Sequence, residues 1–452
     1  MIEATKSICP VCMRVIDAFY MEDDAKVFLE KNCPEHGLFR TLASPSVDQF
    51  IKWQNPCLNV PPKKTITNYD KGCPFDCGPC TEHLQTACCV LLEITERCNQ
   101  KCPYCFASSG YKPAPDVPIS EIAKWLDHLR ELDKERPFNI QLSGGEPTVR
   151  DDLPQIIALV KQKGFEYVQL NTNGRRLAME TGYAKKLADA GLSAVFLQFD
   201  GMNDEIYLKL RGEKLLNIKQ TAIKNCAFAR LPVALVPTVV KGVNLDNIGE
   251  MVDYLLDNLH VLKGIHFQPV SFFGRYPEED INEKRVTMFD IINEINKQTA
   301  GKIPADGLHS LTTGHRLCCF SGSFIKEADG TVVALQKLNS HQTDSCCTPP
   351  VTTLVARDRN FVKNNWKLAQ KASCCGGEGA GLDEFLNALR AKRFTLTGMQ
   401  FQDAMNFDLQ RVRHCRVHIY SPKNKLVPFC AYNLTDINGN YLHRIKYHST
   451  DC

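Results

Sequence analysis

The segment ERCNQKCPYCFA, residues 96–107, contains Cys98, Cys102 and Cys105, with three and then two residues between successive cysteines. It directly follows CVLLEIT, residues 89–95, a short and bounded apolar run of the kind that forms a buried β-strand. Three thiolates so close together in one loop can hold three irons of a 4Fe-4S cluster, and the fourth iron then stays free to bind another molecule. The segment therefore predicts a cluster with an open iron at the end of the first strand of a sheet.

Five further apolar runs of this kind follow the first one along the chain. They span residues 138–143, 167–171, 194–199, 233–240 and 264–270. Segments with 3.6-residue periodicity, such as 120–133 and 247–259, lie between them and predict helices. Six β/α repeats indicate an α/β fold with a parallel sheet covered by helices, either a partial barrel or a doubly wound sheet. In both architectures ligands bind at the carboxyl ends of the strands.

The strong polar motifs of this region come just after predicted strands. The second strand is followed by GGEP, in which Gly144 and Gly145 let the backbone approach a ligand closely and Glu146 supplies an acceptor. The third strand ends in NTNG, with Asn171 and Asn173, and Arg211 lies in the helix that follows the fourth. These residues are therefore the candidates for binding a ligand beside the cluster.

The composition limits the classes of function. With 452 residues and 44% hydrophobic content the chain can bury two or three domains, and a net charge of +3 with interspersed signs gives no reason to expect nucleic acid as a partner. The first residues show no signal peptide, and no apolar stretch approaches a transmembrane span, so we expect a cytoplasmic protein. In that compartment thiols stay reduced, and 22 cysteines indicate metal and cluster ligation instead of disulfides.

Residues 1 to about 60 show the pattern of a small metal module. A CxxC motif is followed by a predicted hairpin with its turn near residues 22–24, and then by CxxH. The four candidate ligands are Cys9, Cys12, Cys33 and His36. This arrangement is typical of a zinc ribbon or a rubredoxin-like site, which holds one Zn or Fe ion tetrahedrally, and Cys57 is an alternative to His36 as the fourth ligand.

A second cysteine triplet precedes the first predicted strand and repeats the spacing of the opening segment. It consists of Cys73, Cys77 and Cys80 in GCPFDCGPC, residues 72–80. If a nearby cysteine closes the set, the cluster is fully ligated and serves as an auxiliary cluster. Cys88 is the candidate fourth ligand, and Cys89 is its alternative.

The CxxxCxxC motif with Tyr104 before its last cysteine, followed by GGEP about forty residues later, resembles the radical SAM superfamily. The resemblance implies a partial (β/α)6 barrel and a cluster whose free iron binds S-adenosylmethionine (SAM), which is reductively cleaved to a 5′-deoxyadenosyl radical. It implies that the GGEP segment holds the methionine amino group and that Asn173 and Arg211 contact the ribose or the carboxylate. It also assigns the radical cluster to the Cys98 triplet, because the Cys73 triplet has Pro79 at the aromatic position.

A narrower resemblance extends over nearly the whole chain. The CPVC and CPEHG motifs, residues 72–88 and residues 406–433 are similar to tetraether lipid synthase-like radical SAM proteins. Such enzymes join the terminal methyl carbons of lipid alkyl chains, and they carry a rubredoxin-like iron and auxiliary clusters. The resemblance implies that Cys415 and Cys430 help to hold a second auxiliary cluster. Its further ligands would be Cys318 or Cys319 and Cys346 or Cys347.

The doublets in SCC, residues 345–347, and SCCGGEG, residues 373–379, depart from that pattern. Vicinal thiols suit a soft substrate atom, so the alternative is modification or methylation of a thiol-, selenium- or arsenic-bearing small molecule. A non-enzymatic alternative is a multi-cluster electron carrier. The GGEP segment argues against it, because an electron carrier needs no methionine site beside an open iron.

We therefore expect four parts and a defined set of partners. The parts are a metal ribbon at 1–60, an auxiliary cluster loop at 61–87, the radical SAM barrel at 88–284, and an α+β, SPASM-like auxiliary-cluster and substrate region at 285–452. The enzyme would need a small-molecule or lipid substrate and an external reductant such as ferredoxin or flavodoxin. A lipid substrate would place it at the membrane periphery.

Overall fold

The computed structural model describes most of the chain. It describes all residues except 56, 111–114, 136–137, 278–280, 336–352, 354–355, 357–359, 362, 369–387 and 445–452. The doublets Cys346-Cys347 and Cys374-Cys375 therefore lie outside the described residues.

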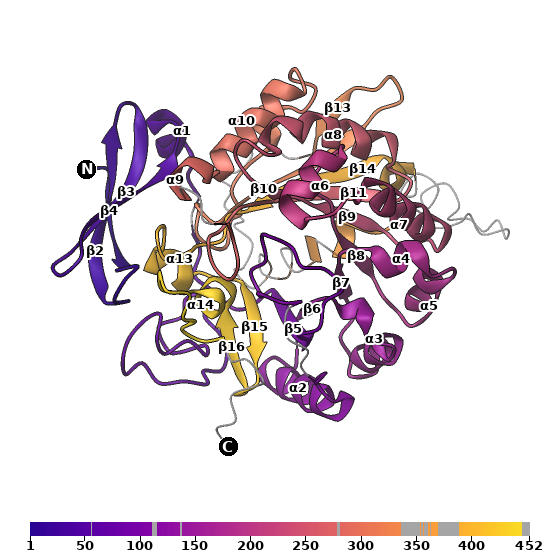
Figure 1. Cartoon of the computed structure of the whole chain (residues 1–452), viewed down its shortest axis with the longest axis horizontal. Helices are drawn as coiled ribbons and strands as arrows, with labels where there is room; N and C mark the ends of the chain where they lie inside the picture. Colours follow the sequence, from indigo (N-terminus) through magenta and orange to yellow (C-terminus); the bar gives the residue numbers. More distant parts are fainter. Residues whose placement is uncertain are drawn as a thin grey trace.

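The amino-terminal module is an antiparallel sheet of four strands in chain order, drawn in indigo in Figure 1. Its strands are β1 (Glu3–Ile8), β2 (Val15–Asp23), β3 (Lys26–Cys33) and β4 (Gly37–Ser44), and α1 (Val47–Lys52) follows. Asp24 and Ala25 connect β2 to β3 with positive φ angles of 48° and 57°, as a tight two-residue hairpin turn requires. The hairpin predicted near residues 22–24 is confirmed.

The remaining described strands form one large curled sheet. Its order is β13-β12-β14-β11-β9-β8-β7-β6-β5-β15-β16, with β10 paired to β11. The central strands are β5 (Cys89–Thr95), β6 (Asn139–Gly144), β7 (Val168–Thr172), β8 (Ala194–Gln198), β9 (Val233–Val236), β10 (Thr238–Val239) and β11 (Leu262–Pro269). From β5 through β11 neighbouring strands on the main path are parallel, which confirms the partial barrel predicted from the apolar runs.

Helices cover the outer face of the parallel strands (Figure 1). They are α2 (Ile119–Leu132), α3 (Leu153–Gln162), α4 (Arg175–Met179), α5 (Tyr183–Asp189), α6 (Asp204–Arg211), α7 (Leu216–Phe228), α8 (Ile248–Asp257) and α10 (Met288–Gln298). The short α9 (Ile281–Lys284) lies beside the amino-terminal module instead, where the Thr41 hydroxyl donates to Asn282 at 3.2 Å. Successive residues of β5 point to opposite faces of the sheet. Val90 and Leu92 belong to the core between the sheet and the covering helices, whereas Cys89 and Leu91 line a cavity on the inner face. Strands buried on both faces read as nearly continuous apolar runs, which is why the sequence revealed them.

The carboxyl-terminal region extends the barrel sheet on both sides. Strands β12 (Cys319–Lys326), β13 (Val332–Ala334) and β14 (Arg393–Met399) continue it beyond β11, with β14 parallel to β11. On the other side β15 (Val417–Ser421) pairs parallel with β5 and antiparallel with β16 (Lys425–Pro428), which Figure 1 shows in yellow. Two short helices complete the region, α13 (Leu409–Arg413) and α14 (Phe429–Asn433). The boundary proposed at residue 284 thus separates segments that share one sheet.

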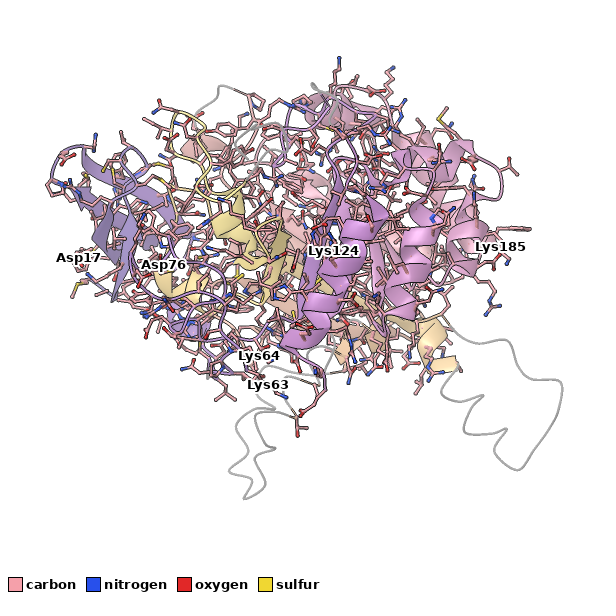
Figure 2. The ribbon with its side chains drawn as sticks, turned by 90° about the horizontal axis from the view of Figure 1, so that it is seen from below. Asp17, Lys63, Lys64, Asp76, Lys124 and Lys185 are labelled. Atoms are coloured by element: carbon pink, nitrogen blue, oxygen red, sulfur yellow. The ribbon has the colours of Figure 1, made fainter. Side chains whose placement is uncertain are left out.

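The amino-terminal module packs against this carboxyl-terminal region through buried polar contacts. Asp408 accepts hydrogen bonds from the Tyr20 hydroxyl at 2.7 Å and from Thr5 at 2.8 Å. Figure 2 shows Asp17 of the module at one end of the molecule and Lys185 of α5 at the other, with Asp76 of the cysteine-rich loop on the side of the module. None of the helices in the described part of the chain combines the length and apolar character needed to span a membrane.

Candidate active site

A cavity of about 410 Å³ begins at the carboxyl ends of the parallel strands and continues into the barrel. Its wall contains the three cysteines of the opening motif and the residues that sequence analysis placed beside them. These residues are Cys98, Cys102, Cys105, Gly144, Gly145, Glu146, Asn173 and Arg211. The fold thus brings together side chains from the ends of several strands, as expected for an α/β enzyme.

The loop that carries the Cys98 triplet is fixed by the segment after β11. Arg275 exchanges two backbone hydrogen bonds with Cys105, of 2.8 and 2.9 Å, and its side chain donates to the Cys102 carbonyl at 2.8 Å. Burial raises the pKa of Cys98 to about 12 and also raises the pKa of Cys102. Thiols in this environment lose their protons only when they bind iron. The spacing of the three cysteines suits three corners of a 4Fe-4S cluster.

The two glycines of GGEP pack directly onto the backbone that leads into the cysteine loop. A Cβ on Gly144 would lie 2.1 Å from the Thr95 carbonyl oxygen, and one on Gly145 would lie 2.3 Å from that of Arg97. Gly144 also has a φ of +132°. From the sequence, we expected glycine at these two positions because it lets the backbone approach a ligand closely. Their tightest contacts are instead with the protein backbone, so they hold Glu146 beside the Cys98 loop.

The Glu146 carboxylate is 1% exposed and joins the ends of β6 and β7. One oxygen accepts hydrogen bonds from the Thr148 hydroxyl at 2.6 Å and the Thr172 hydroxyl at 2.7 Å. The other accepts from the backbone N–H of Asn173 at 2.7 Å. A carboxylate oxygen has two acceptor directions, so the second oxygen keeps one for a cationic ligand group in the cavity.

Asn173 and Arg211 are also tied to the protein. The Asn173 side chain donates to Asn99 of the cysteine loop at 2.7 Å. The guanidinium of Arg211 is bidentate with the fully buried Asp200, at 2.6 and 2.7 Å, and donates to the Tyr104 carbonyl at 3.2 Å. Arg211 therefore clamps the loop of the Cys98 triplet to the end of β8.

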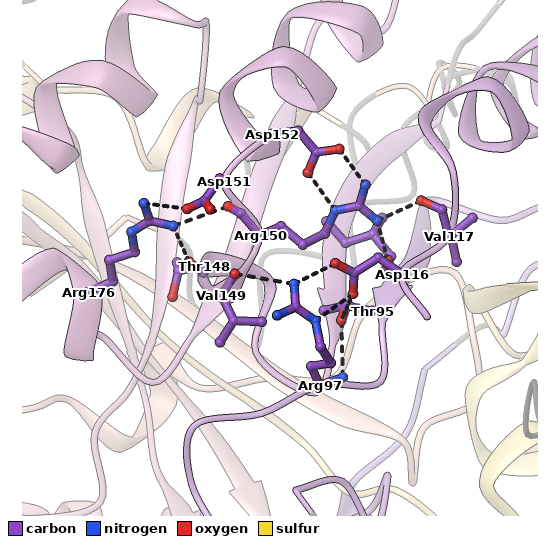
Figure 3. Close-up of polar contacts among 11 residues, drawn as sticks. Thr95, Arg97, Asp116, Val117, Thr148, Val149, Arg150, Asp151, Asp152 and Arg176 are labelled. Carbon is purple, nitrogen blue, oxygen red and sulfur yellow. Dashed lines mark hydrogen bonds and ion pairs between the residues drawn. The ribbon is translucent and has the colours of Figure 1, made fainter. Parts of the chain in front are cut away.

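Three arginine–aspartate pairs lie beside the cysteine loop and the GGEP segment, outside the cavity lining (Figure 3). The pairs are Arg97 with Asp116, Arg150 with Asp152, and Arg176 with Asp151. Arg150 is buried and also donates to the carbonyls of Ile94 and Val117, both at 2.7 Å. This network orients the ends of β5 and β6 relative to each other without reaching the cavity itself.

The Cys73 triplet lies in the loop before β5. A hydrogen bond with Cys73 and burial raise the pKa of Cys77, and Cys80 and Cys415 add to that effect. Cys88, the predicted fourth ligand, and its alternative Cys89 instead line the main cavity, where Cys89 donates to Gln141 at 3.3 Å. Outside the triplet, the charge of Cys415 is one of the causes that raise the pKa of Cys77.

A second cysteine group lines the same cavity as the Cys98 triplet. It contains Cys318, Cys415 and Cys430. Burial, followed by the charges of Cys430 and Cys318, raises the pKa of Cys415, and Cys430 has its pKa raised to about 12, mainly by burial. Cys318 takes part in these interactions, whereas Cys319 begins β12 and pairs with Met399 in the sheet.

The amino-terminal module brings its four predicted ligands together. The ligand atoms of Cys9, Cys12, Cys33 and His36 lie within 4.8 Å of one another. His36 Nδ1 lies 3.6 Å from the Cys9 sulfur and 3.5 Å from the Cys33 sulfur. Three soft sulfurs and one imidazole at this spacing fit a tetrahedral Zn or Fe site. Cys57 is not in this group, and its charged neighbours are Cys318 and Arg316.

Apart from Asn171, sequence analysis did not single out the amides that line the interior of the barrel. Each of the inner strands β6, β7, β8 and β11 contributes at least one. They are Asn139, Gln141, Gln169, Asn171, Gln198 and Gln268. A signal was present, because each amide interrupts or ends an otherwise apolar run.

An aromatic cluster occupies the wall between the Cys98 triplet and the second cysteine group. The Phe429 ring centroid lies 5.6 Å from that of Phe106, 6.4 Å from that of Phe273 and 4.2 Å from that of Phe401. All four rings line the cavity. One part of the cavity wall therefore carries hydrogen-bonding amides, and another part is largely apolar.

Comparison with known families finds a match for the barrel and another for the amino-terminal module. Residues 92–255 match the model of the radical SAM superfamily, and residues 1–45 match that of the HMPTM N-terminal zinc ribbon domain. The first match contains the Cys98 triplet and the GGEP segment. The second contains the four ligands of the amino-terminal module.

Among curated proteins, the chain is 33% identical to the 7,8-dihydro-6-hydroxymethylpterin dimethyltransferase of Methanocaldococcus jannaschii, covering 95% of this chain and 93% of that protein. It is 30% identical to a probable GTP 3′,8-cyclase of Methanothermobacter thermautotrophicus over 38% of this chain and 55% of the cyclase. Among solved structures, anSMEcpe with bound AdoMet matches with a TM-score of 0.36 and 15% identity, over 64% of this chain and 86% of that one. Streptococcus suis SuiB bound to its precursor peptide matches with a TM-score of 0.40 and 15% identity, over 49% and 47%.

Proposed function

The chain belongs to the radical SAM superfamily, in the family that includes the M. jannaschii pterin dimethyltransferase, and we propose that it transfers methyl groups to a pterin-type heterocycle. The observation that carries this proposal is the single cavity that contains the Cys98 triplet, the Glu146 carboxylate and the amide-lined interior of the barrel. Membership of the superfamily makes the protein an enzyme that uses SAM and a 4Fe-4S cluster, and this excludes the simple electron carrier.

The residues of the cavity suit the two cofactors. When bound, the cluster and SAM together supply a 5′-deoxyadenosyl radical that abstracts hydrogen from a substrate carbon. Cys98, Cys102 and Cys105 would hold three irons. The free acceptor direction of Glu146 would bind the methionine ammonium group, and Asn173 would lie close to the rest of the SAM molecule. Arg211 would act mainly by fixing the cysteine loop, because its guanidinium is already paired with Asp200.

The amides of the barrel interior support a flat, polar substrate. A pterin-type ring presents donors and acceptors around its edge, and glutamine and asparagine side chains can satisfy both kinds. The aromatic rings nearby offer faces on which such a ring can stack. A volume of about 410 Å³ is within the range of pockets that bind small organic molecules.

Coupling of lipid alkyl chains is the second candidate function. The resemblance to tetraether lipid synthase-like proteins suggests it, and the aromatic cluster of Phe106, Phe273, Phe401 and Phe429 favours it. An alkyl radical must be kept from water and from stray hydrogen donors, and a wall of phenylalanine rings provides that shelter. Under this candidate the protein would work at the membrane periphery.

The third candidate, modification of a thiol-, selenium- or arsenic-bearing small molecule, depends on the doublets Cys346-Cys347 and Cys374-Cys375. These residues lie outside the described part of the chain, so no contact supports a role for them. All three candidates share the need for an external reductant such as ferredoxin or flavodoxin, and for auxiliary clusters held by the remaining cysteine groups.

The test is anaerobic turnover of the reconstituted enzyme with SAM, a chemical reductant and one of two substrates, 6-hydroxymethyl-7,8-dihydropterin or an archaeal-type diether lipid. We expect 5′-deoxyadenosine and methionine from one SAM molecule, together with a pterin product whose mass has increased by added methyl groups. Each methyl group would come from a second SAM molecule, released as S-adenosylhomocysteine, and the chemical reductant would supply the two electrons that each cycle needs. A coupled lipid product, with the pterin unchanged, would overturn the pterin proposal in favour of the second candidate. If the same amount of 5′-deoxyadenosine forms with and without either substrate, both candidate functions are contradicted.

A further inference from the structure

Three polar residues lie opposite one another on neighbouring strands of the extended barrel sheet. His266 of β11 pairs in register with Thr397 of β14, and Thr397 pairs in register with Ser321 of β12. Residues that are directly opposite across a ladder lie on the same face of a sheet. All three line the active-site cavity, and we call His266, Thr397 and Ser321 the polar row.

The hydrogen bonds of Thr397 determine which nitrogen of His266 carries the proton. His266 Nδ1 lies 2.8 Å from the Thr397 hydroxyl oxygen, and this hydroxyl donates its one hydrogen to the Ile265 carbonyl at 3.4 Å. The hydroxyl can then only accept from the imidazole, so Nδ1 carries the proton and Nε2 has a free lone pair. His266 Nε2 is therefore an acceptor, and none of the described residues donates to it.

This acceptor is uncharged. Burial lowers the pKa of His266 to about 4, and no neighbouring charge contributes to the shift. The imidazole is therefore neutral near pH 7 and has no charge with which to attract a phosphate or a carboxylate. It suits a neutral N–H or O–H group of a ligand.

Ser321 provides an unsatisfied hydroxyl in the same row. Its side chain is 3% exposed, and its Oγ has no hydrogen-bond partner among the described residues. Burying a hydroxyl without a partner is unfavourable, so such a group in a cavity wall indicates a ligand that completes it. The hydroxyl can donate to a ligand carbonyl beside the group that His266 accepts from.

Aromatic rings form the wall next to the polar row. The Phe196 ring centroid lies 5.5 Å from that of His266 and 4.8 Å from that of Trp366. The Trp366 indole N–H donates to the Thr395 hydroxyl of β14 at 2.9 Å, which holds this ring against the sheet. Phe196 and Trp366 both line the cavity. Such a wall favours a planar ring as the ligand, because its face can pack on theirs.

The polar row lies deeper in the barrel than the Cys98 triplet. His266 precedes Pro269, the last residue of β11, by three residues, which is about 10 Å of strand. The segment after β11 binds the loop of the Cys98 triplet through the backbone bonds between Arg275 and Cys105. Gln268 lines the cavity between the row and the strand end. A ligand held by the row can therefore extend past Gln268 toward the cysteine loop.

We propose that the polar row binds the edge of a planar, neutral heterocycle on which an N–H group stands beside a carbonyl. The ring N–H donates to His266 Nε2, and the carbonyl accepts from Ser321. This inference rests on the proposed function and deepens it, because a pterin-type ring carries such a cyclic amide edge. The hydroxymethyl-bearing side of the pterin is across the fused rings from that edge, so it faces the Cys98 triplet.

The first test measures binding of 6-hydroxymethyl-7,8-dihydropterin to the anaerobically reconstituted protein by isothermal titration calorimetry. Ser321→Ala should weaken binding about twofold to tenfold, the loss expected for one neutral hydrogen bond. Ser323→Ala is the matched control, because the Ser323 Oγ is also buried without a partner among the described residues and lies on the same strand, yet Ser323 is not among those that line the cavity. It should bind the dihydropterin like the wild type.

Two substitutions of His266 separate a ligand contact from support of the fold. A glutamine amide reaches about as far as Nε2 of histidine, whereas an asparagine amide reaches only as far as Nδ1. His266→Gln should therefore keep more affinity for the dihydropterin than His266→Asn, which should lose about twofold to tenfold. Equal loss in the two variants would show that His266 acts through the fold and would overturn the contact.

A dihydropterin methylated at the ring N–H tests the edge itself. This analogue lacks the donor, so wild type and His266→Asn should bind it with the same affinity. The inference alone is overturned if wild type binds the unmodified dihydropterin and Ser321→Ala and His266→Asn bind it equally well, or if Ser323→Ala loses as much affinity as Ser321→Ala. No binding of the unmodified dihydropterin by the wild type would contradict the proposed function together with the inference.

Discussion

The backbone N–H of Asn173 donates to the Glu146 carboxylate at 2.7 Å and so joins the carboxyl ends of β6 and β7. This contact brings the segment that would hold the SAM amino group into register with the next strand of the barrel. The same carboxylate is bound by Thr148 and Thr172, which leaves little freedom for its orientation. A ligand ammonium group would therefore meet a carboxylate that is already fixed in place.

Replacement of Glu146 by glutamine should weaken SAM binding more than it disturbs the cluster. The amide has the same size, but its NH₂ group must face one of the present donors, which costs about 1–3 kcal/mol. Loss of the charged partner for the ammonium should weaken SAM affinity about tenfold to a hundredfold. Titration of the electron paramagnetic resonance signal with SAM measures this effect.

The control for that experiment is Glu180→Gln, which alters a partly exposed pair with Arg176 away from the cavity. It should bind SAM like the wild type. Unchanged SAM affinity in Glu146→Gln would contradict the role assigned to Glu146.

Removal of Arg211 should destabilise the fold because it leaves Asp200 buried and unpaired. The expected loss is about 3–5 kcal/mol of unfolding free energy for Arg211→Gln. The double variant Asp200→Asn/Arg211→Gln should recover part of this loss, since no uncompensated charge remains. Denaturant unfolding monitored by circular dichroism measures both. If the double variant is as unstable as the single one, the ion pair is not the reason for the destabilisation.

The Cys73 triplet should be needed after SAM cleavage and not for it. Replacement of Cys73, Cys77 and Cys80 by alanine removes an auxiliary cluster, while the Cys98 triplet keeps its own. We expect 5′-deoxyadenosine still to form in this variant, with completed product absent, as measured by liquid chromatography and mass spectrometry. Normal product formation, or SAM binding at the Cys73 cluster in the wild type, would contradict this division.

The amino-terminal module should lose one metal ion when Cys33 is replaced by serine. The site needs deprotonated thiols, so acid should release the same ion from the wild type as the pH falls. Loss of the ion should loosen β1 to β4 and expose the module to limited proteolysis, while the cluster iron stays in place. Elemental analysis gives the readout, and an unchanged metal content in Cys33→Ser would show that the four residues do not form the site.

The parallel strands could be predicted closely from the sequence because burial on both faces makes each of them an apolar run. The segment 194–199 was predicted and β8 spans Ala194–Gln198, and 89–95 coincides with β5. The flanking strands β12, β14 and β15 could not be predicted in the same way. They join the sheet through pairings between residues far apart in the sequence, which local periodicity does not reveal.

The residues of the candidate site could likewise be predicted where they are close together in the sequence, and not where they are far apart. The Cys98 triplet and the four ligands of the amino-terminal module were predictable because each set occupies a short stretch of chain. The environment of Cys57 was not, since its neighbours Cys318 and Arg316 lie more than 250 residues away.

The most direct test of the central claim is electron–nuclear double resonance on the reduced enzyme with SAM labelled with nitrogen-15 in its amino group. We predict hyperfine coupling between this nitrogen and the cluster in the wild type and in the variant without the Cys73 triplet. The coupling should be lost when Cys98, Cys102 and Cys105 are replaced by alanine. Coupling that survives the loss of the Cys98 triplet, or that disappears with the Cys73 triplet, would contradict the account of this active site.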